Sequence, residues 1–339
     1  MLEKLLIICA AILLCMPARA SAAQVSFFIG DVELLRNGKK FPVAVGDKLK
    51  TGDVIKTGKD SVMEVQDDNG STIKILPMSS ATIGSKKISG SDTLSLIAGD
   101  LSSAFTKLMK GSTKIYSPTT IAAVRGTEFT MNVSSGGDTR IDLSEGEVDV
   151  SNPYGKTIMR QKDKIESRVG EGPRSSSGTA EEWKKMSSQR FAQNPGAKAD
   201  DTGRYLDTLS ERGKDTGNAM VTVRSAVKDA TSKESLKQAE SLLNSTEEKT
   251  VDDLYLNESI GHSLEYTMEN FKDKDDALYS RFKSAFLKSN RVAEQHQKNL
   301  AALKKIREEY QKAYENIVGR YKSKSEEIKS KFKDKKSGI

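Results

Sequence analysis

Residues 117–129 read Ser-Pro-Thr-Thr-Ile-Ala-Ala-Val-Arg-Gly-Thr-Glu-Phe, and they decide how the first half of the chain is interpreted. The centre of this stretch is small or branched, as a tightly stacked strand requires: Ala122, Ala123 and Val124. Gly126 then permits a bulge or a close approach between two backbones. Arg125 and Glu128 are three residues apart, which favours a partly buried ion pair with each other or with a neighbouring turn. The stretch predicts densely packed β structure.

Short alternating runs lie on both sides of it. Residues 62–65 and 72–76 flank Asp67-Asp68-Asn69-Gly70, and the Asn-Gly pair suits a tight hairpin turn. A second hairpin is predicted around 135–138, and the alternation continues through Val148, Val150, Ile158 and Ile165. Strands this short and numerous, with no helical stretch between them, predict an all-β domain built as a sandwich, a barrel or a short β-solenoid.

Two Gly-Asp pairs mark further turns, Gly46-Asp47 and Gly52-Asp53. Glycine allows the positive φ that such a turn needs, and the aspartate side chain accepts hydrogen bonds from nearby backbone amides.

These blocks, in this order, resemble the FecR family over residues 24–170. The signature of that family corresponds here to Pro118, Val124, Arg125, Gly126, Thr127, Glu128 and Phe129, and its paired Gly-Asp turns to Gly46, Asp47, Gly52 and Asp53. The resemblance implies a periplasmic β domain. We expect these residues to be structural, with docking of a partner as the alternative and catalysis disfavoured.

Members that give this family its name relay a signal from an outer-membrane receptor to a cytoplasmic sigma factor, through a cytoplasmic arm and one membrane span. Only Met1–Lys4 precede the apolar run Leu5–Leu14 here, which is too short an arm to hold a sigma factor. The sigma-regulating activity is therefore not carried over. The resemblance leaves an exported FecR-like β domain joined to a second region.

The N-terminus has the form of a signal peptide. The apolar run is about half the length of a membrane span, and Ala20-Ser21-Ala22 fits the small-residue cleavage rule. We expect residues 1–22 to be removed, no membrane span in the mature chain, and a periplasmic or extracellular location. Cys9 and Cys15 follow Ile8 and Leu14, which disfavours a lipoprotein. Because both cysteines lie in the leader, the mature chain would hold no thiol chemistry or disulfide.

The second half is helical in pattern. Residues 171–178 are rich in Gly and Ser and predict a linker between a 23–170 domain and a 179–339 helical region. Thr179-Ala180-Glu181-Glu182 has the form of a capping box ahead of Trp183. Further faces recur every three or four residues, a strong one at Leu256, Ile260, Leu264, Met268 and Phe271 and a weaker one at Leu206, Leu209, Met220, Val223 and Val227.

The last segment predicts a long coiled-coil-like helix. A seven-residue spacing links Phe286, Ala293, Leu300, Tyr314, Tyr321 and Ile328, with Leu303, Tyr310 and Ile317 between them, whereas Arg307 interrupts the series and Ser289 and His296 weaken it. Such a helix packs either within the chain, in a helical hairpin, or against a second copy in a homo-oligomer.

Charge and chemistry motifs name no ligand. The net charge is +7, and the last twenty residues hold 8 basic against 3 acidic side chains, a basic tail suited to peripheral contact with anionic lipid or polysaccharide or simply to a solvated helix end.

Nucleic acid is disfavoured as a partner because no aromatic platform accompanies the lysines. We expect no cofactor and no metal: His262 and His296 lack ligand spacing, the Asp67–Gly70 turn lacks the acids of a calcium loop, and Gly213 and Gly217 suggest only close helix contact.

The sequence thus predicts an exported, non-enzymatic binding or scaffolding module of the cell envelope, whose partner is an envelope protein or a polysaccharide. The alternative is a soluble accessory of a receptor–sigma factor system. An enzyme acting on peptidoglycan or polysaccharide is a distant third.

Overall fold

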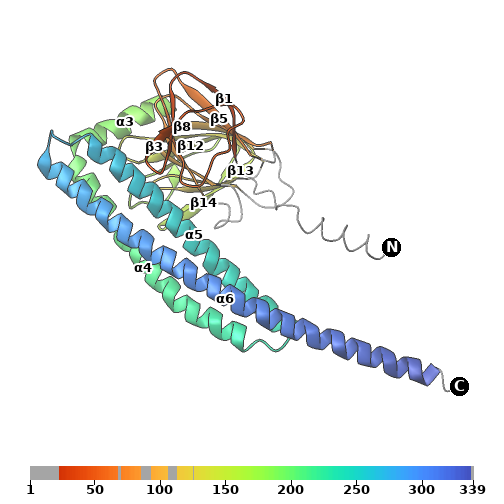
Figure 1. Cartoon of the computed structure of the whole chain (residues 1–339). Coiled ribbons are helices and arrows are strands. Elements are labelled where there is room, and N and C mark those ends of the chain that lie inside the picture. The colour runs from red at the N-terminus through yellow and green to blue at the C-terminus, as the bar shows by residue number, and fades with distance from the viewer. Residues whose placement is uncertain (1–22, 68–69, 85–92, 106–112, 125, 337–339) are drawn as a thin grey trace.

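The computed structural model describes residues 23–67, 70–84, 93–105, 113–124 and 126–336. The predicted signal peptide, residues 1–22, lies outside these ranges, as do Asp68, Asn69 and Arg125. A strand-rich region is followed by long helices, so the predicted α+β organisation is confirmed. In Figure 1 the β region rests against one end of a long helical bundle.

The strands of the described residues form two sheets that share one long strand, β8 (Thr93–Ala104). Sheet A contains, in order, β1 (Gln24–Ile29), β5 (Val62–Gln66), β6 (Thr72–Ile75), β8, β11 (Glu128–Val133), β12 (Thr139–Glu145), β15 (Lys164–Ser167) and β16 (Arg174–Ser175). Sheet B contains β3 (Lys39–Phe41), β2 (Val32–Arg36), β4 (Val54–Thr57), β7 (Ser80–Ile83), β8, β9 (Thr113–Tyr116), β10 (Ile121–Val124), β13 (Glu147–Asn152) and β14 (Gly155–Arg160).

The two sheets face each other across one hydrophobic core. That core takes side chains from both, for example Met63, Leu101 and Phe129 from sheet A with Ile55 and Val148 from sheet B. The β domain is therefore a two-layer sandwich. The chain crosses from one sheet to the other after every one to three strands, which is the solenoid-like aspect of the arrangement.

Both predicted hairpins are confirmed. Strands β5 and β6 pair with Met63 opposite Ile75, and β11 and β12 pair on either side of the 135–138 turn. In that second turn Gly137 has φ +80° and its amide donates to the Ser134 carbonyl. Alternation in these runs reflects one face in the sandwich core and one face outside it.

Gly146, between β12 and β13, gives a testable case of backbone constraint. It has φ +91°, and a Cβ there would lie 2.7 Å from the Gly126 carbonyl oxygen and 2.7 Å from Thr127 Cγ2. Gly46 has the same φ of +91° but nothing within 4 Å. Gly46→Ala should therefore lower the free energy of unfolding by about 1 kcal/mol through φ alone. Gly146→Ala should cost about 1 kcal/mol more because of the overlap, as urea denaturation can measure. Equal losses in the two variants would contradict this account.

The helical region begins as the sequence predicts. Helix α3 (Ala180–Gln193) is capped by Thr179, whose side chain accepts from the Glu182 amide while the Glu182 carboxylate accepts from the Thr179 amide. Helices α4 (Pro195–Lys228), α5 (Lys233–Glu269) and α6 (Asp276–Lys336) follow and pack together as a three-helix bundle. Figure 1 shows α6 running past the turn between α4 and α5.

The predicted faces of α4 and α5 are buried in this bundle. Leu206, Leu209, Leu256, Ile260, Leu264 and Met268 lie in a cluster near the β domain, and Val223 and Val227 lie in a second cluster farther along. The described helix α6 therefore packs within its own chain, which is the hairpin-like alternative; self-association stays a prediction.

The residues of α6 that contact the rest of the bundle form one row along the helix. At several positions this row is shifted by one residue from the predicted seven-residue series. Ala285, Val292 and Ile306 are buried in place of Phe286, Ala293 and Arg307, while Tyr314 and Tyr321 are 45% and 47% exposed. The intermediate positions Leu303, Tyr310 and Ile317 are buried as predicted. Ser289 and His296 belong to the same stripe, because Ser289 hydrogen-bonds Asn257 of α5 and His296 packs against Gly213 of α4. Hydrophobicity alone does not reveal polar positions of that kind.

The segment predicted as an open linker is tied to the sandwich. Strand β16 pairs with β15, and the Arg140 guanidinium donates to the carbonyls of Ser177 and Gly178 at 2.9 Å each. Arg140 is fully buried and also pairs with Asp142 at 2.6 Å. A buried guanidinium needs several acceptors, and the chain leaving the sheet supplies them. The bounds of 23–170 and 179–339 stay predictions.

Candidate functional site

The hairpin of β9 and β10 contacts the bundle through a partly buried ion pair. Lys114 Nζ donates to both carboxylate oxygens of Asp252 on α5, at 2.8 and 2.9 Å, and the Tyr116 hydroxyl donates to the same carboxylate at 2.8 Å. Glu248 pairs with Lys114 from the solvent side at 2.8 Å. Although burial lowers it, the pKa of Lys114 is raised overall by the two carboxylates. The lysine is held in its charged form at the joint.

Apolar packing continues across this joint. Tyr116 and Ile121 of the hairpin belong to the same core cluster as Leu256 and Ile260 of α5. The rings of Tyr116 and Tyr255 lie 5.1 Å apart at a tilt of 42°. Because the cluster contains side chains from the sandwich and from the bundle, the two regions share a core rather than meeting at a wet surface.

The turn of this hairpin, Ser117–Thr120, is held by buried hydroxyls. Thr139 Oγ1 lies 2.7 Å from Ser117 Oγ and 2.7 Å from Thr119 Oγ1. The Asn152 side chain donates to the Thr119 carbonyl at 3.0 Å. Such short polar side chains satisfy backbone groups that no sheet partner reaches, so the turn holds Pro118 rigidly toward the helices.

Helix α3 is anchored beside it by two buried carboxylates. Trp183 Nε1 donates to Glu166 of β15 at 2.8 Å. Asp138 accepts from Ser187 Oγ at 2.8 Å and from Lys198 Nζ at 2.6 Å. Burial alone would raise the pKa of Asp138, but Lys198 and Ser187 hold it below its usual value. Asp138 is thus a charged, fully engaged anchor rather than a free acid or base.

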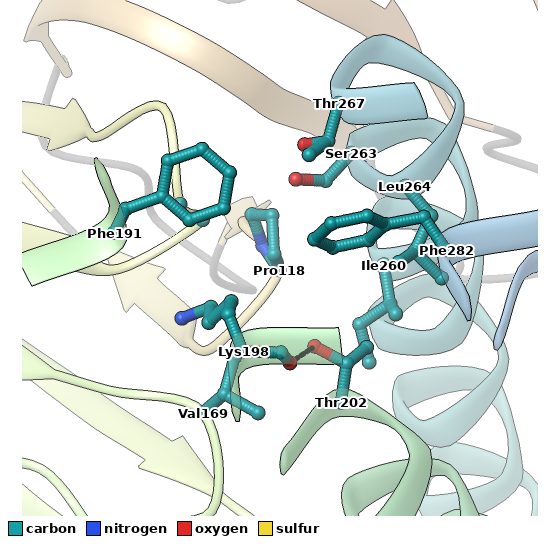
Figure 2. Close-up of a pocket in the computed structure, with 12 residues that line it drawn as sticks. Pro118, Val169, Phe191, Lys198, Thr202, Ile260, Ser263, Leu264, Thr267 and Phe282 are labelled. Atoms are coloured by element: carbon teal, nitrogen blue, oxygen red, sulfur yellow. Dashed lines mark hydrogen bonds between the residues drawn. The ribbon is translucent and has the colours of Figure 1, made fainter. Parts of the chain in front are cut away.

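A small cavity lies where these elements meet. Its volume is about 20 Å³, room for roughly one water molecule. Figure 2 shows Pro118 between Phe191 of α3 and Phe282 of α6, with Ser263 and Thr267 of α5 above. Helix α4 contributes Lys198 and Thr202, so all four described helices converge on the hairpin turn. The site is a joint between the sandwich and the bundle, and the cavity at Pro118 itself is too small for an organic ligand.

The predicted Gly-Asp turns lie elsewhere. Gly46 and Gly52 have φ of +91° and +82°, and Asp47 and Asp53 accept from the amides of Ala44 and Lys50 at 2.8 and 2.7 Å. Asp53 is fully buried and pairs bidentately with Arg36, at 2.8 and 2.7 Å. Nothing in the sequence singles out Arg36, because the partner of a buried aspartate is set by strand pairing.

The other signature residues spread along β10 and β11. Val124 and Phe129 are in the sandwich core, Thr127 is buried, Gly126 has φ +62°, and Glu128 is exposed. The register of β11 against β12 shifts between Glu128 and Phe129, next to the bulge predicted at Gly126. Arg125 lies outside the described residues, so its predicted ion pair is untested. Among the described residues of the predicted set, Pro118 alone lines the cavity at the joint.

The two histidines lie on different helices. His296 is fully buried in the bundle, and the Nδ1 of His262 is 3.8 Å from Glu265. Within the described ranges, no three His, Cys, Asp or Glu side chains gather as a metal site. None of the described helices has a stretch long and apolar enough to cross a membrane.

The fold is thus a β-sandwich whose hairpin turn is docked on a helical bundle. Residues 53–149 match the sequence model of the family described as FecR protein, so the sandwich carries a FecR domain. Two crystal structures of a protein described as a "putative anti-sigma factor" from Parabacteroides distasonis ATCC 8503 align with 38% of this chain, at 11% identity and a TM-score of 0.33. The match covers 61% of that protein, and a likeness of this size does not bear on function. No curated protein matches the chain.

Proposed function

We propose that this protein is an exported, non-enzymatic binding and scaffolding module of the cell envelope, in which the FecR domain and the helical bundle act as one body. The observation that carries the proposal is the joint. The signature turn at Pro118 is covered by helices of the same chain, and the charges beside it, Lys114 and Asp138, are already paired. A partner therefore contacts the outer faces that the joint holds in a fixed relation.

Crosslinking in cells that make the protein tests this proposal. The tagged wild-type chain should recover the same envelope component in replicate experiments. Asp252→Ala, which breaks the joint, should recover clearly less, whereas Glu248→Ala, which removes an exposed partner of the same lysine, should recover as much as wild type. Cell fractionation in the same experiment places the protein in or outside the envelope.

Two outcomes would count against the proposal. One is that neither wild type nor Glu248→Ala recovers a reproducible component. The other is that Asp252→Ala recovers as much of the component as wild type. That result would show that a partner binds one region alone and that the joint has no part in binding.

The second candidate is an accessory of cell-surface signalling, favoured by the FecR domain itself. Deleting the gene separates the two candidates. A signalling accessory should change transcripts that depend on an extracytoplasmic sigma factor, whereas a scaffold should leave them unchanged and alter the envelope assembly recovered by crosslinking.

A further inference from the structure

A second, larger cleft lies between the outer face of sheet B and the C-terminal turns of α5. Its volume is about 630 Å³, which falls in the range of about 300–1,000 Å³ that small ligands occupy. One wall belongs to the FecR domain and the other to the bundle. Ligand sites occur preferentially at such domain interfaces. The cleft is separate from the small cavity at Pro118.

The floor of the cleft combines apolar and hydroxyl groups. Val54 and Ile97 point to the outer face of sheet B because their neighbours Ile55 and Leu96 fill the sandwich core. Thr82 lies beside them, and its Oγ1 is buried with no hydrogen-bond partner. Buried hydroxyls are normally paired, so this oxygen is an unsatisfied polar atom in a floor that also carries Ser80 and Lys56.

The helical wall presents an aromatic ring between two carboxylates. Tyr266 is 42% exposed, and the Glu265 and Glu269 side chains are each 61% exposed. Successive turns of α5 place these residues along the same cleft. Of the residues that line it, all within the described ranges, Lys56 is cationic while Glu265 and Glu269 are anionic.

This set of groups fits a ligand with both apolar and hydroxyl-bearing faces. The C–H face of a pyranose packs on an aromatic ring, and its hydroxyls donate to carboxylates. An N-acetyl group adds a methyl that suits Val54, which is partly exposed in the cleft. Because the walls carry more carboxylate than cationic charge, a neutral sugar is favoured over an acidic one.

We infer that the cleft between sheet B and α5 binds a neutral oligosaccharide of N-acetylated amino sugars. The inference rests on the proposed envelope-binding function and assigns that function a ligand class. The site needs both regions, since Val54 comes from the sandwich and Tyr266 from the bundle.

Titration calorimetry of the full mature chain with the N-acetylglucosamine trimer tests it. The trimer should bind the wild type, and Tyr266→Ala should weaken binding by about tenfold or more. Tyr314→Ala is the matched control, because Tyr314 is similarly exposed, at 45%, but lies on α6 outside the cleft. Glu265→Gln, which keeps the side-chain shape, should weaken binding as well. Thermal melting of each variant checks that the fold is kept.

Three results would overturn the inference: no binding of the trimer to wild type at millimolar concentration, equal binding by Tyr266→Ala, or tighter binding of an acidic oligosaccharide such as a trimer of galacturonate. These readouts use purified protein and a defined sugar. Crosslinking to an envelope protein could therefore still succeed where the trimer fails, so the failure of this inference is distinguishable from failure of the proposed function.

Discussion

Asp252→Ala should lower the free energy of unfolding by about 3 kcal/mol, the cost of breaking a largely buried ion pair by removing one partner. Side-chain exposure at the pair is 14% for Lys114 and 20% for Asp252. The substitution leaves the ammonium without its main counter-charge and the Tyr116 hydroxyl without an acceptor. Both groups remain under the helix, so water cannot fully replace what is lost.

Glu248→Ala provides the matched control for this prediction. Glu248 contacts the same Lys114 nitrogen at the same 2.8 Å, but its side chain is 67% exposed. An exposed pair is screened by solvent, so the expected loss is about 0.5 kcal/mol. Guanidinium denaturation followed by circular dichroism measures both variants. Equal losses, or a loss below about 1 kcal/mol in Asp252→Ala, would contradict a buried joint.

The same experiment reports on whether the joint couples the two regions. Trp183 is buried against Glu166 of the sandwich, so its fluorescence follows the β side of the joint, while circular dichroism at 222 nm follows mainly the helices. Wild type should show one coincident transition, since the two regions share a core cluster. Asp252→Ala should shift both signals together to a lower denaturant concentration, because the shared apolar cluster still links the two regions. Separate transitions in this variant would show that the ion pair itself couples them.

Local patterns in the sequence were sufficient for the local structure. The Asn-Gly turn placed β5 and β6, the capping box placed the start of α3, and the three-to-four spacing from Leu256 to Met268 placed the buried face of α5. In each case the signal and the structure it predicts lie within a few residues. The resemblance to the FecR family predicted the order of the turns along the chain. It did not predict which helices pack against them.

The joint itself could not be predicted, for a physical reason. Lys114 and Asp252 are 138 residues apart, and the chain holds 54 basic and 47 acidic side chains with no local feature that selects this pair. Pro118 belongs to a recognised motif, yet its neighbours Phe191 and Phe282 come from two helices that no sequence periodicity relates to it. Contacts of this kind follow from how preformed elements pack, which a single sequence does not reveal.

The register of α6 failed to follow the pattern for a related reason. Seven-residue spacing fits two adjacent rows of a helix almost equally well. The row that faces α4 and α5 includes Ser289 and His296. Because both residues are polar, the sequence did not identify this row as the buried one. Their place is explained only by their partners, Asn257 for the serine and the small Gly213 for the imidazole.

His296 makes the bundle sensitive to acid. It is fully buried, and neither ring nitrogen meets a partner in hydrogen-bonding geometry. Burial lowers the pKa of His296 to about 4; the backbone of Leu209 favours the protonated ring and the charge of Arg212 on α4 disfavours it. The unfolded chain takes up its proton near pH 6.5. Stability from the neutral ring is thus complete above pH 6.5 and is lost as the pH falls toward 4.

Glu258 of α5 changes the stability with pH in the opposite direction to His296. The effect of His296 can therefore be measured only after Glu258 is replaced. Burial raises the pKa of Glu258 to about 7, against the hydrogen bond from Gln297. The folded protein therefore takes up a proton at Glu258 before the unfolded chain does. Its contribution to stability rises as the pH falls from 7 to about 4.5. In the wild type the contributions of His296 and Glu258 to the pH dependence of stability largely cancel between pH 7 and 5.

Glu258→Gln should therefore expose the histidine. Between pH 7 and pH 5 this variant should lose about 2 kcal/mol of unfolding free energy, the linkage value for a ring whose pKa falls from 6.5 to about 4 on folding. The double variant Glu258→Gln, His296→Leu should lose much less over the same interval, because leucine carries no proton and leaves no unpaired nitrogen in the bundle. Urea denaturation at pH 7, 6 and 5 measures all three proteins. If the single and double variants keep the same pH dependence, protonation of His296 does not control the acid stability of the bundle.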